Sequence, residues 1–454
     1  MGVVEIFKWI YSFEEETKVD LHETASDLKG EVILSKNENG LIFNLGFPDY
    51  KLLFQNQTNF IISHNSYKIK SLHFLDKIDR KNWLARYCNV YMFSSLIFNE
   101  EEEKYHSYYS KITSSSILAI FIYKLGLKEL TISIKNLKFK ITTCSINPEI
   151  KYNFLCIECD SKISFKLFKH YVNNIIVSLG FITGRFYKNE EFYFQSINLD
   201  FSENTNFFYR NSEKKYSFPK PITRTPSEWA WKFKNDFELN EELEQKWSSQ
   251  VDNSVFSSLV ELLIEKPRLY FAIRMLFDFY YTPQISRVSL MFVILETLCE
   301  ELNTKEFKIE KEFKKENGLL TLKRIKKKIS DEDLIILQDI IENIDSKLTN
   351  NVVHFEQTIK SLKLNLTNEE RKILVNRNEF FHGRIIPVSH KINTEEDYSS
   401  LEFKYDYYSL RLYVLVSKIL LKKSGFEGYL INYPKLFEEN NEMNLKKESY
   451  FTKL

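Results

Sequence analysis

Three prolines interrupt one short stretch near the middle of the chain, Ser217-Phe218-Pro219-Lys220-Pro221-Ile222-Thr223-Arg224-Thr225-Pro226-Ser227. Proline lacks a backbone N–H and ends regular structure, and no comparable cluster of prolines occurs elsewhere in the sequence. From about residue 18 to 215, short runs alternate between apolar and polar residues, which is typical of β-strands, whereas beyond the prolines apolar residues recur at helical spacing. The sequence therefore predicts an α+β fold, with a β-rich domain over residues 1–216, a linker over 217–239 and a helical domain over 240–454.

The first half carries two hairpin signals and one helix signal. Alternating runs lie on both sides of Asn39-Gly40 and again around Asn136, and both patterns predict two strands joined by a tight turn. Apolar residues at helical spacing from Phe165 to Leu179 predict a helix that ends at Gly180. Because the strands are short and unevenly spaced, a sandwich and a barrel-like arrangement fit equally well.

Helical spacing in the second half predicts helices at Val255–Tyr281, Ile285–Leu302, Asp331–Leu348, Asn368–His382 and Tyr398–Lys423. Within the second of these, the run Val288–Leu298 is apolar nearly all round, which predicts a central helix of a bundle. Glu296 is an isolated charge on that helix, and a buried carboxylate needs a cation nearby. Arg377, Arg287 and Arg274 are all candidate partners.

Composition limits the function classes that fit. The chain has 454 residues with 43% apolar and 28% charged, and its 63 Lys and Arg balance 62 Asp and Glu, so no overall field attracts nucleic acid and any polyanion site must be local. Five scattered cysteines fit a reducing compartment, and no apolar run approaches the roughly 20 residues that span a bilayer. We expect a cytoplasmic protein with no membrane contact. The absence of a P-loop or GxGxxG argues against nucleotide-driven work.

The stretch richest in chemistry is Arg377-Asn378-Glu379-Phe380-Phe381-His382, at the end of a predicted helix. It places a fixed cation, an amide and a titratable imidazole within about 8 Å of helix rise, which suits work on a phosphodiester. Asn378 and His382 are four residues apart, so the amide is expected to orient the imidazole. The alternative is a structural arginine paired with a glutamate and a surface histidine.

The spacing Arg377-Asn378-x-x-x-His382 resembles the R-N-x-x-x-H signature of the HEPN superfamily of helical ribonucleases. The resemblance implies an all-α bundle over roughly residues 240 to 425, whose motif helices pair across a homodimer to form one site for metal-independent RNA cleavage. It further implies that Arg377 holds the scissile phosphate, that His382 transfers a proton and that Asn378 supports the geometry. Glu296 would support the site by positioning the guanidinium.

The order of the two halves is also similar to that of the ApeA-type anti-phage proteins. That likeness implies an endoribonuclease in abortive-infection defence, toxic if unregulated, with the N-terminal domain as the sensor of a phage-derived trigger. The alternative is a non-catalytic, dimeric interaction protein that keeps only a degenerate HEPN-like bundle.

A basic tract from Thr304 to Lys328 contains ten Lys or Arg against four Glu, a local excess of six positive charges. It is the best candidate for contacts with the RNA backbone, and a solvated helical face is the equal alternative. The residues expected to bind RNA are Lys323, Arg324, Lys326, Lys327 and Lys328. No metal site or other cofactor is expected: Cys156 and Cys159 form the sole CxxC and lie in a predicted strand, where their side chains point to opposite faces.

Overall fold

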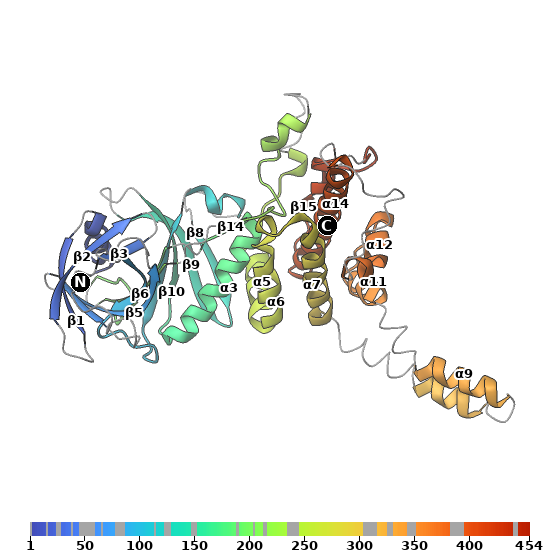
Figure 1. Ribbon diagram of the computed structural model, residues 1–454, viewed down its shortest axis with the longest axis horizontal. Helices are drawn as coiled ribbons and strands as arrows, with labels where there is room; N and C mark the ends of the chain where they lie inside the picture. The colour runs from blue at the N-terminus through green and yellow to red at the C-terminus, as the bar shows by residue number, and fades with distance from the viewer. Residues whose placement is uncertain are drawn as a thin grey trace. The chain divides into compact units, whose positions relative to one another are not determined.

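The computed structural model describes residues 2–14, 17–23, 29–37, 40–44, 60–64, 67–77, 87–112, 115–121, 129–146, 152–187, 190–202, 205–211, 216–233, 245–302, 316–324, 330–342, 351–381, 395–438 and 444–454. The chain forms two compact units, the first made of residues 1–217 and 250–261 and the second of residues 218–249 and 262–454. The first is rich in antiparallel strands and the second in helices (Figure 1), so the fold is α+β.

The second unit therefore includes residues 218–233 of the segment expected to be a linker, where Phe218 and Ile222 are buried. One of the boundaries between the units, after Glu261, falls inside a helix, α5 (Asn253–Glu265).

Six strands of the first unit close into a ring. They are β1 (Thr17–Glu23), β2 (Lys29–Asn37), β3 (Gly40–Asn44), β4 (Phe60–His64), β5 (Tyr67–Lys77) and β6 (Tyr87–Ser95). Their order is β3-β2-β1-β4-β5-β6, and β6 pairs back onto β3. This half of the unit corresponds to the barrel-like alternative.

The strand β6 also belongs to a second set of strands. Its residues 87–90 pair with β3 and its residues 92–94 pair with β13 (Asn206–Asn211), while β5 runs along its other edge. From β13 the sheet continues through β12 (Glu190–Ser196), β7 (Tyr105–Ile112), β10 (Asn153–Cys159), β9 (Leu137–Ser145) and β8 (Glu129–Ile134). All of these pairings are antiparallel.

Both predicted hairpins are present. Asn37 of β2 pairs with Gly40 of β3, although the turn residue Asn39 lies outside the described residues. Between β8 and β9, Lys135 and Asn136 have φ values of 46° and 70°, as a type I′ turn requires. The alternation predicted on either side of this turn places Leu130, Ile132, Ile134, Phe139 and Ile141 in the core.

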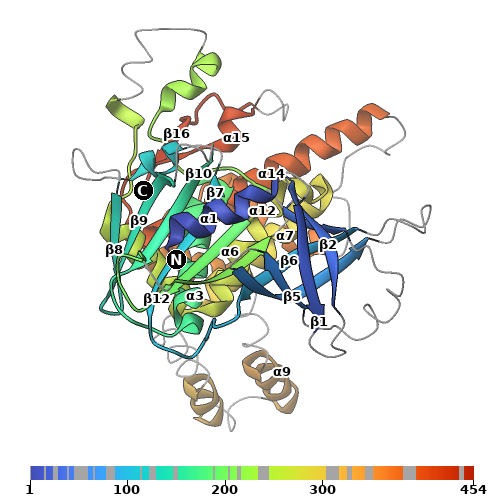
Figure 2. The same cartoon turned by 90° about the vertical axis from the view of Figure 1, so that its left-hand side faces the viewer.

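Two helices cover opposite faces of the second set of strands. The helix α1 (Val3–Tyr11) packs Phe7 against Phe154 and Phe192, and α3 (Phe165–Thr183) packs Phe165 against Tyr193, which points to the other face of β12. Figure 2 shows α1 lying across the strands. The helix α1 was not predicted from the sequence. The predicted end of α3 at Gly180 was wrong, because the helix continues to a left-handed cap at Gly184, with φ 69°.

The second unit is built around α7 (Gln284–Leu302), which packs against α6 (Pro267–Leu276), α11 (Asn351–Ser361), α13 (Arg377–Phe381) and α14 (Glu395–Lys423). The helix α12 (Asn368–Val375) packs against α14. Residues 316–324 form a further helix, followed by α9 (Asp331–Glu342). The chain ends with β15 (Tyr429–Ile431), α15 (Tyr433–Leu436) and β16 (Phe451–Lys453), of which β16 pairs with β15.

Two predicted helices are broken in the structure. The helix expected over Val255–Tyr281 is divided between α5 and α6 because Pro267 cannot donate the N–H that would continue the ladder. The helix expected over Asn368–His382 is interrupted at Asn376, whose backbone (φ −83°, ψ 8°) leaves the helical region. His382 lies outside the described residues.

The remaining short elements are β11 (Arg185–Phe186) paired with β14 (Tyr216–Ser217), and the 3-10 turns η1 (Ser12–Glu14), η2 (Ser115–Ile120), η3 (Pro226–Phe233) and η4 (Phe279–Tyr281). No helix in the described part of the chain combines the length and apolarity that crossing a bilayer requires.

Candidate functional site

Arg377 is the first residue of α13, directly after the break at Asn376. Its Nε donates a hydrogen bond to Oε1 of Glu296 on α7, and its Nη1 donates to Oδ1 of Asn378 at 2.9 Å. The two charged side chains are 20% and 25% exposed, which is enough for a solvent-borne ligand to reach them. The guanidinium is thus fixed in orientation by a carboxylate and an amide while it stays accessible.

Of the three arginines considered as partners of Glu296, Arg377 makes the contact. Arg287 pairs with Asp406 of α14 at 3.0 Å and donates to the carbonyl of Thr282, and its guanidinium lies over the ring of Phe279. It therefore fixes the turn before α7. Arg274 lies over the ring of Phe277.

Phe380 anchors the short helix α13 between two longer ones. Its ring centroid lies 5.7 Å from that of Phe292 on α7, and 5.8 Å and 5.6 Å from those of Tyr405 and Tyr408 on α14. The Ser289 hydroxyl on α7 donates to the Phe380 carbonyl at 3.5 Å. Because Phe380 is three residues from Arg377 on the same helix, these contacts fix the backbone that carries the guanidinium.

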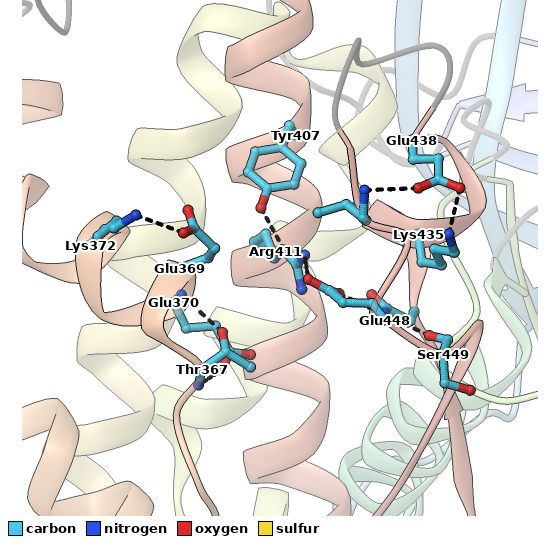
Figure 3. Close-up of polar contacts among 12 residues, drawn as sticks. Thr367, Glu369, Glu370, Lys372, Tyr407, Arg411, Lys435, Glu438, Glu448 and Ser449 are labelled. Carbon is cyan, nitrogen blue, oxygen red and sulfur yellow. Dashed lines mark hydrogen bonds and ion pairs between the residues drawn. The ribbon is translucent and has the colours of Figure 1, made fainter.

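The start of α12 is held by a capping box, for which Thr367-Asn368-Glu369-Glu370 has the sequence signature. The Glu370 N–H donates to Oγ1 of Thr367 at 3.1 Å, and the Thr367 N–H donates to Oε2 of Glu370 at 2.7 Å. Figure 3 shows the two side chains facing each other at the first turn. The other carboxylate oxygen of Glu370 accepts a 2.8 Å bond from Nζ of Lys418 on α14, and both groups are buried.

The helix α14 is buried all round from residue 411 to 421, yet it carries two cations there. Arg411 pairs with Glu448 and with the hydroxyl of Tyr407 (Figure 3), and Lys418 pairs with Glu370. Lys418 was not among the residues predicted from the sequence. A lone lysine inside an otherwise apolar run is the same signal that identified Glu296, and it would have found this residue.

The other predicted site residues are partly described. Asn378 is exposed, and its Oδ1 contacts Arg377; its expected contact with His382 lies outside the described residues. Lys323 and Arg324 are exposed at the end of the helix over residues 316–324, whereas Lys326, Lys327 and Lys328 lie outside the described residues.

Thiol chemistry is not available next to Glu296. The nearby thiol of Cys299 is buried on α7, and burial raises its pKa to about 12 against the opposing effect of a hydrogen bond with Thr358. The CxxC lies in β10 as predicted, and burial raises the pKa of both thiols. In the part of the chain that the structure describes, no three His, Cys, Asp or Glu side chains are grouped as a metal ion would need.

In comparisons with known proteins, no family model, no curated protein and no solved structure matches this chain.

Proposed function

We propose that this protein is a metal-independent endoribonuclease of the HEPN type, acting in anti-phage defence by abortive infection, with the N-terminal unit as the sensor. The observation that carries the proposal is the contact of Arg377 with Glu296, beside Asn378, at a partly exposed position. The guanidinium is oriented by a carboxylate and an amide and is still reachable from solvent, as a phosphate-binding group must be.

The proposed chemistry uses the substrate's own nucleophile. The 2′-hydroxyl of a ribose attacks the adjacent phosphorus and loses its proton, and the 5′-oxygen of the next nucleotide leaves with a proton, which gives a 2′,3′-cyclic phosphate and a 5′-hydroxyl. His382 is assigned the proton transfer because an imidazole is the side chain that ordinarily gains and loses a proton near neutral pH. Arg377 would stabilise the extra negative charge on the phosphate oxygens.

Glu296 has two opposite effects in this scheme. It orients the guanidinium before substrate arrives, and it competes with the phosphate for the same cation. A bidentate guanidinium can serve both anions at once because its donors form a planar fork. Lys323 and Arg324 would contribute contacts with the RNA backbone, together with Lys326, Lys327 and Lys328.

The proposal includes a homodimer through the helical unit. One motif helix supplies few groups, whereas two helices related by a two-fold axis supply a double set around one groove. Sedimentation velocity of the full chain measures this directly. A strictly monomeric protein that still cleaved RNA would contradict the dimeric part of the proposal.

The decisive test compares His382→Ala with His390→Ala, a matched change of a second histidine eight residues further on. We expect the parent and His390→Ala to cleave single-stranded RNA in excess EDTA and to leave 2′,3′-cyclic phosphate ends, and His382→Ala to leave the RNA intact. Strict dependence on a divalent metal would contradict the mechanism. A parent chain that folds and dimerises but leaves RNA intact would instead be the non-catalytic interaction protein.

A further inference from the structure

The two helices that precede and contain the motif are fixed by one ion pair at each end. Glu370, in the first turn of α12, contacts Lys418 of α14, and Arg377, the first residue of α13, contacts Glu296 of α7. Arg377 lies seven positions after Glu370, which corresponds to about two helical turns, or roughly 10 Å of helix rise. The segment therefore spans two different helices of the bundle and carries opposite charges at its two attachments.

The two ion pairs differ in burial. Glu370 and Lys418 have side chains that are 2% and 10% exposed, whereas those of Arg377 and Glu296 are 20% and 25% exposed. Between the two charged residues, Ile373 and Leu374 are buried. The pair at the start of α12 is thus closed to solvent, and the pair at the motif is open to it.

Apolar contacts alone would fix α12 poorly. Burial of Ile373 and Leu374 is non-directional, and a small rotation or shift of an eight-residue helix would keep most of it. A buried ion pair behaves differently, because loss of one partner leaves the other charge without solvent or counter-ion. Glu370 also accepts the Thr367 N–H, so one carboxylate ties the start of α12 to its own cap and to α14.

We propose that Lys418 and Glu370 are positioning residues for the Arg377 site: their buried ion pair sets the rotation and height of α12 on α14, and thereby the place where Arg377 meets the substrate phosphate. The catalytic part of this inference rests on the proposed function. The structural part, that the ion pair fixes α12, rests on the contacts alone. Only one residue, Asn376, separates the end of α12 from Arg377, so the position of α12 limits where α13 can begin.

The experiment uses the full chain with Lys418→Gln and, as the matched control, Lys435→Gln. Lys435 is also a buried lysine in an ion pair, with Glu438 at 2.5 Å and with side chains 7% and 20% exposed, but it lies on α15 and its partner Glu438 is two residues beyond that helix, not on α12. Hydrogen exchange followed by mass spectrometry reports on the peptide covering residues 368–381. We expect Lys418→Gln to raise its exchange rate about tenfold or more, and Lys435→Gln to leave it unchanged.

RNA cleavage is measured on the same variants. For Lys418→Gln we expect kcat to fall about tenfold or more with KM unchanged, because a misplaced guanidinium binds the RNA but stabilises the transition state less well. Lys418→Arg keeps the charge and is expected to restore most of kcat. A protein that merely lost stability would not show this split or this rescue. If Lys418→Gln does not fold, Glu370→Gln replaces it, since an amide oxygen still accepts from the Thr367 N–H while the ion pair is lost.

The outcomes separate the two proposals. Unchanged exchange in residues 368–381, or full kcat in Lys418→Gln, overturns the positioning role while leaving the nuclease intact. If Lys418→Gln raises the exchange rate of residues 368–381 but the parent chain cleaves no RNA, the proposed function is overturned. The ion pair of Lys418 with Glu370 then has no catalytic consequence.

Discussion

Replacing Phe380 with alanine tests whether α13 is held by packing between α7 and α14. Phe380 is 6% exposed and its ring meets three others, those of Phe292, Tyr405 and Tyr408. Loss of a buried phenyl ring costs about 3–5 kcal/mol because the lost transfer energy adds to the energy of the cavity. Tyr408 is only half-buried and part of the cavity can fill, so we expect a loss near the lower end, about 3 kcal/mol.

The loss is measured by urea unfolding followed by far-UV circular dichroism, with the free energy of unfolding extrapolated to water. Val375→Ala is the matched control on the neighbouring helix, since Val375 is 65% exposed and its truncation should change the free energy by less than about 0.5 kcal/mol. A loss below about 1 kcal/mol for Phe380→Ala, with an unchanged m value, would refute the packing argument. In the proposed nuclease the same variant should also lose cleavage, because Arg377 moves with α13.

Three further predictions follow from single residues. In Arg377→Lys the charge remains but the fork that contacts both Glu296 and a phosphate is lost, so kcat for RNA cleavage should fall about a hundredfold, and an unchanged kcat would exclude the assigned role. Burial lowers the pKa of His106 to about 4, against the opposing effect of backbone hydrogen bonds, so the unfolded chain binds a proton below pH 6.5 that the folded chain does not. The contribution of His106 to the free energy of unfolding should therefore be nearly constant above pH 6.5 and fall by about 3 kcal/mol as the pH drops from 6.5 to 4, and urea titrations of His106→Gln should show a correspondingly smaller dependence on pH. Lys135 has a φ of 46°, which glycine adopts without strain, so Lys135→Gly should raise the free energy of unfolding by about 1 kcal/mol; a lower melting temperature would contradict this.

Local chemistry made parts of the fold predictable. The turn at Asn136 and the capping box at Thr367 depend on backbone angles and side chains only a few residues apart, so the sequence alone indicated both. The end of α3 was missed because Gly180 and Gly184 are equally good terminators locally, and packing on the sheet extends the helix to the second.

For the candidate site, too, local patterns indicate residues but not how they pack together. The Arg377 motif and the isolated charge of Glu296 were visible in the sequence, but which arginine Glu296 contacts depends on how α7 and α13 pack. The break at Asn376 was missed because the apolar spacing continues across it. Residues far apart in the sequence, such as Glu370 and Lys418, are brought together by tertiary packing that no local pattern encodes.

The sharing of β6 between the closed ring and the neighbouring strands limits how this chain can change. Side chains alternate between the two faces of a strand, so inserting or deleting one residue in β6 would turn every later side chain to the opposite face. A change at the start of β6 would disturb its pairing with β3, β5 and β13 together, since each pairs with part of β6. Insertions and deletions are accordingly far better tolerated in the connections between strands than within β6.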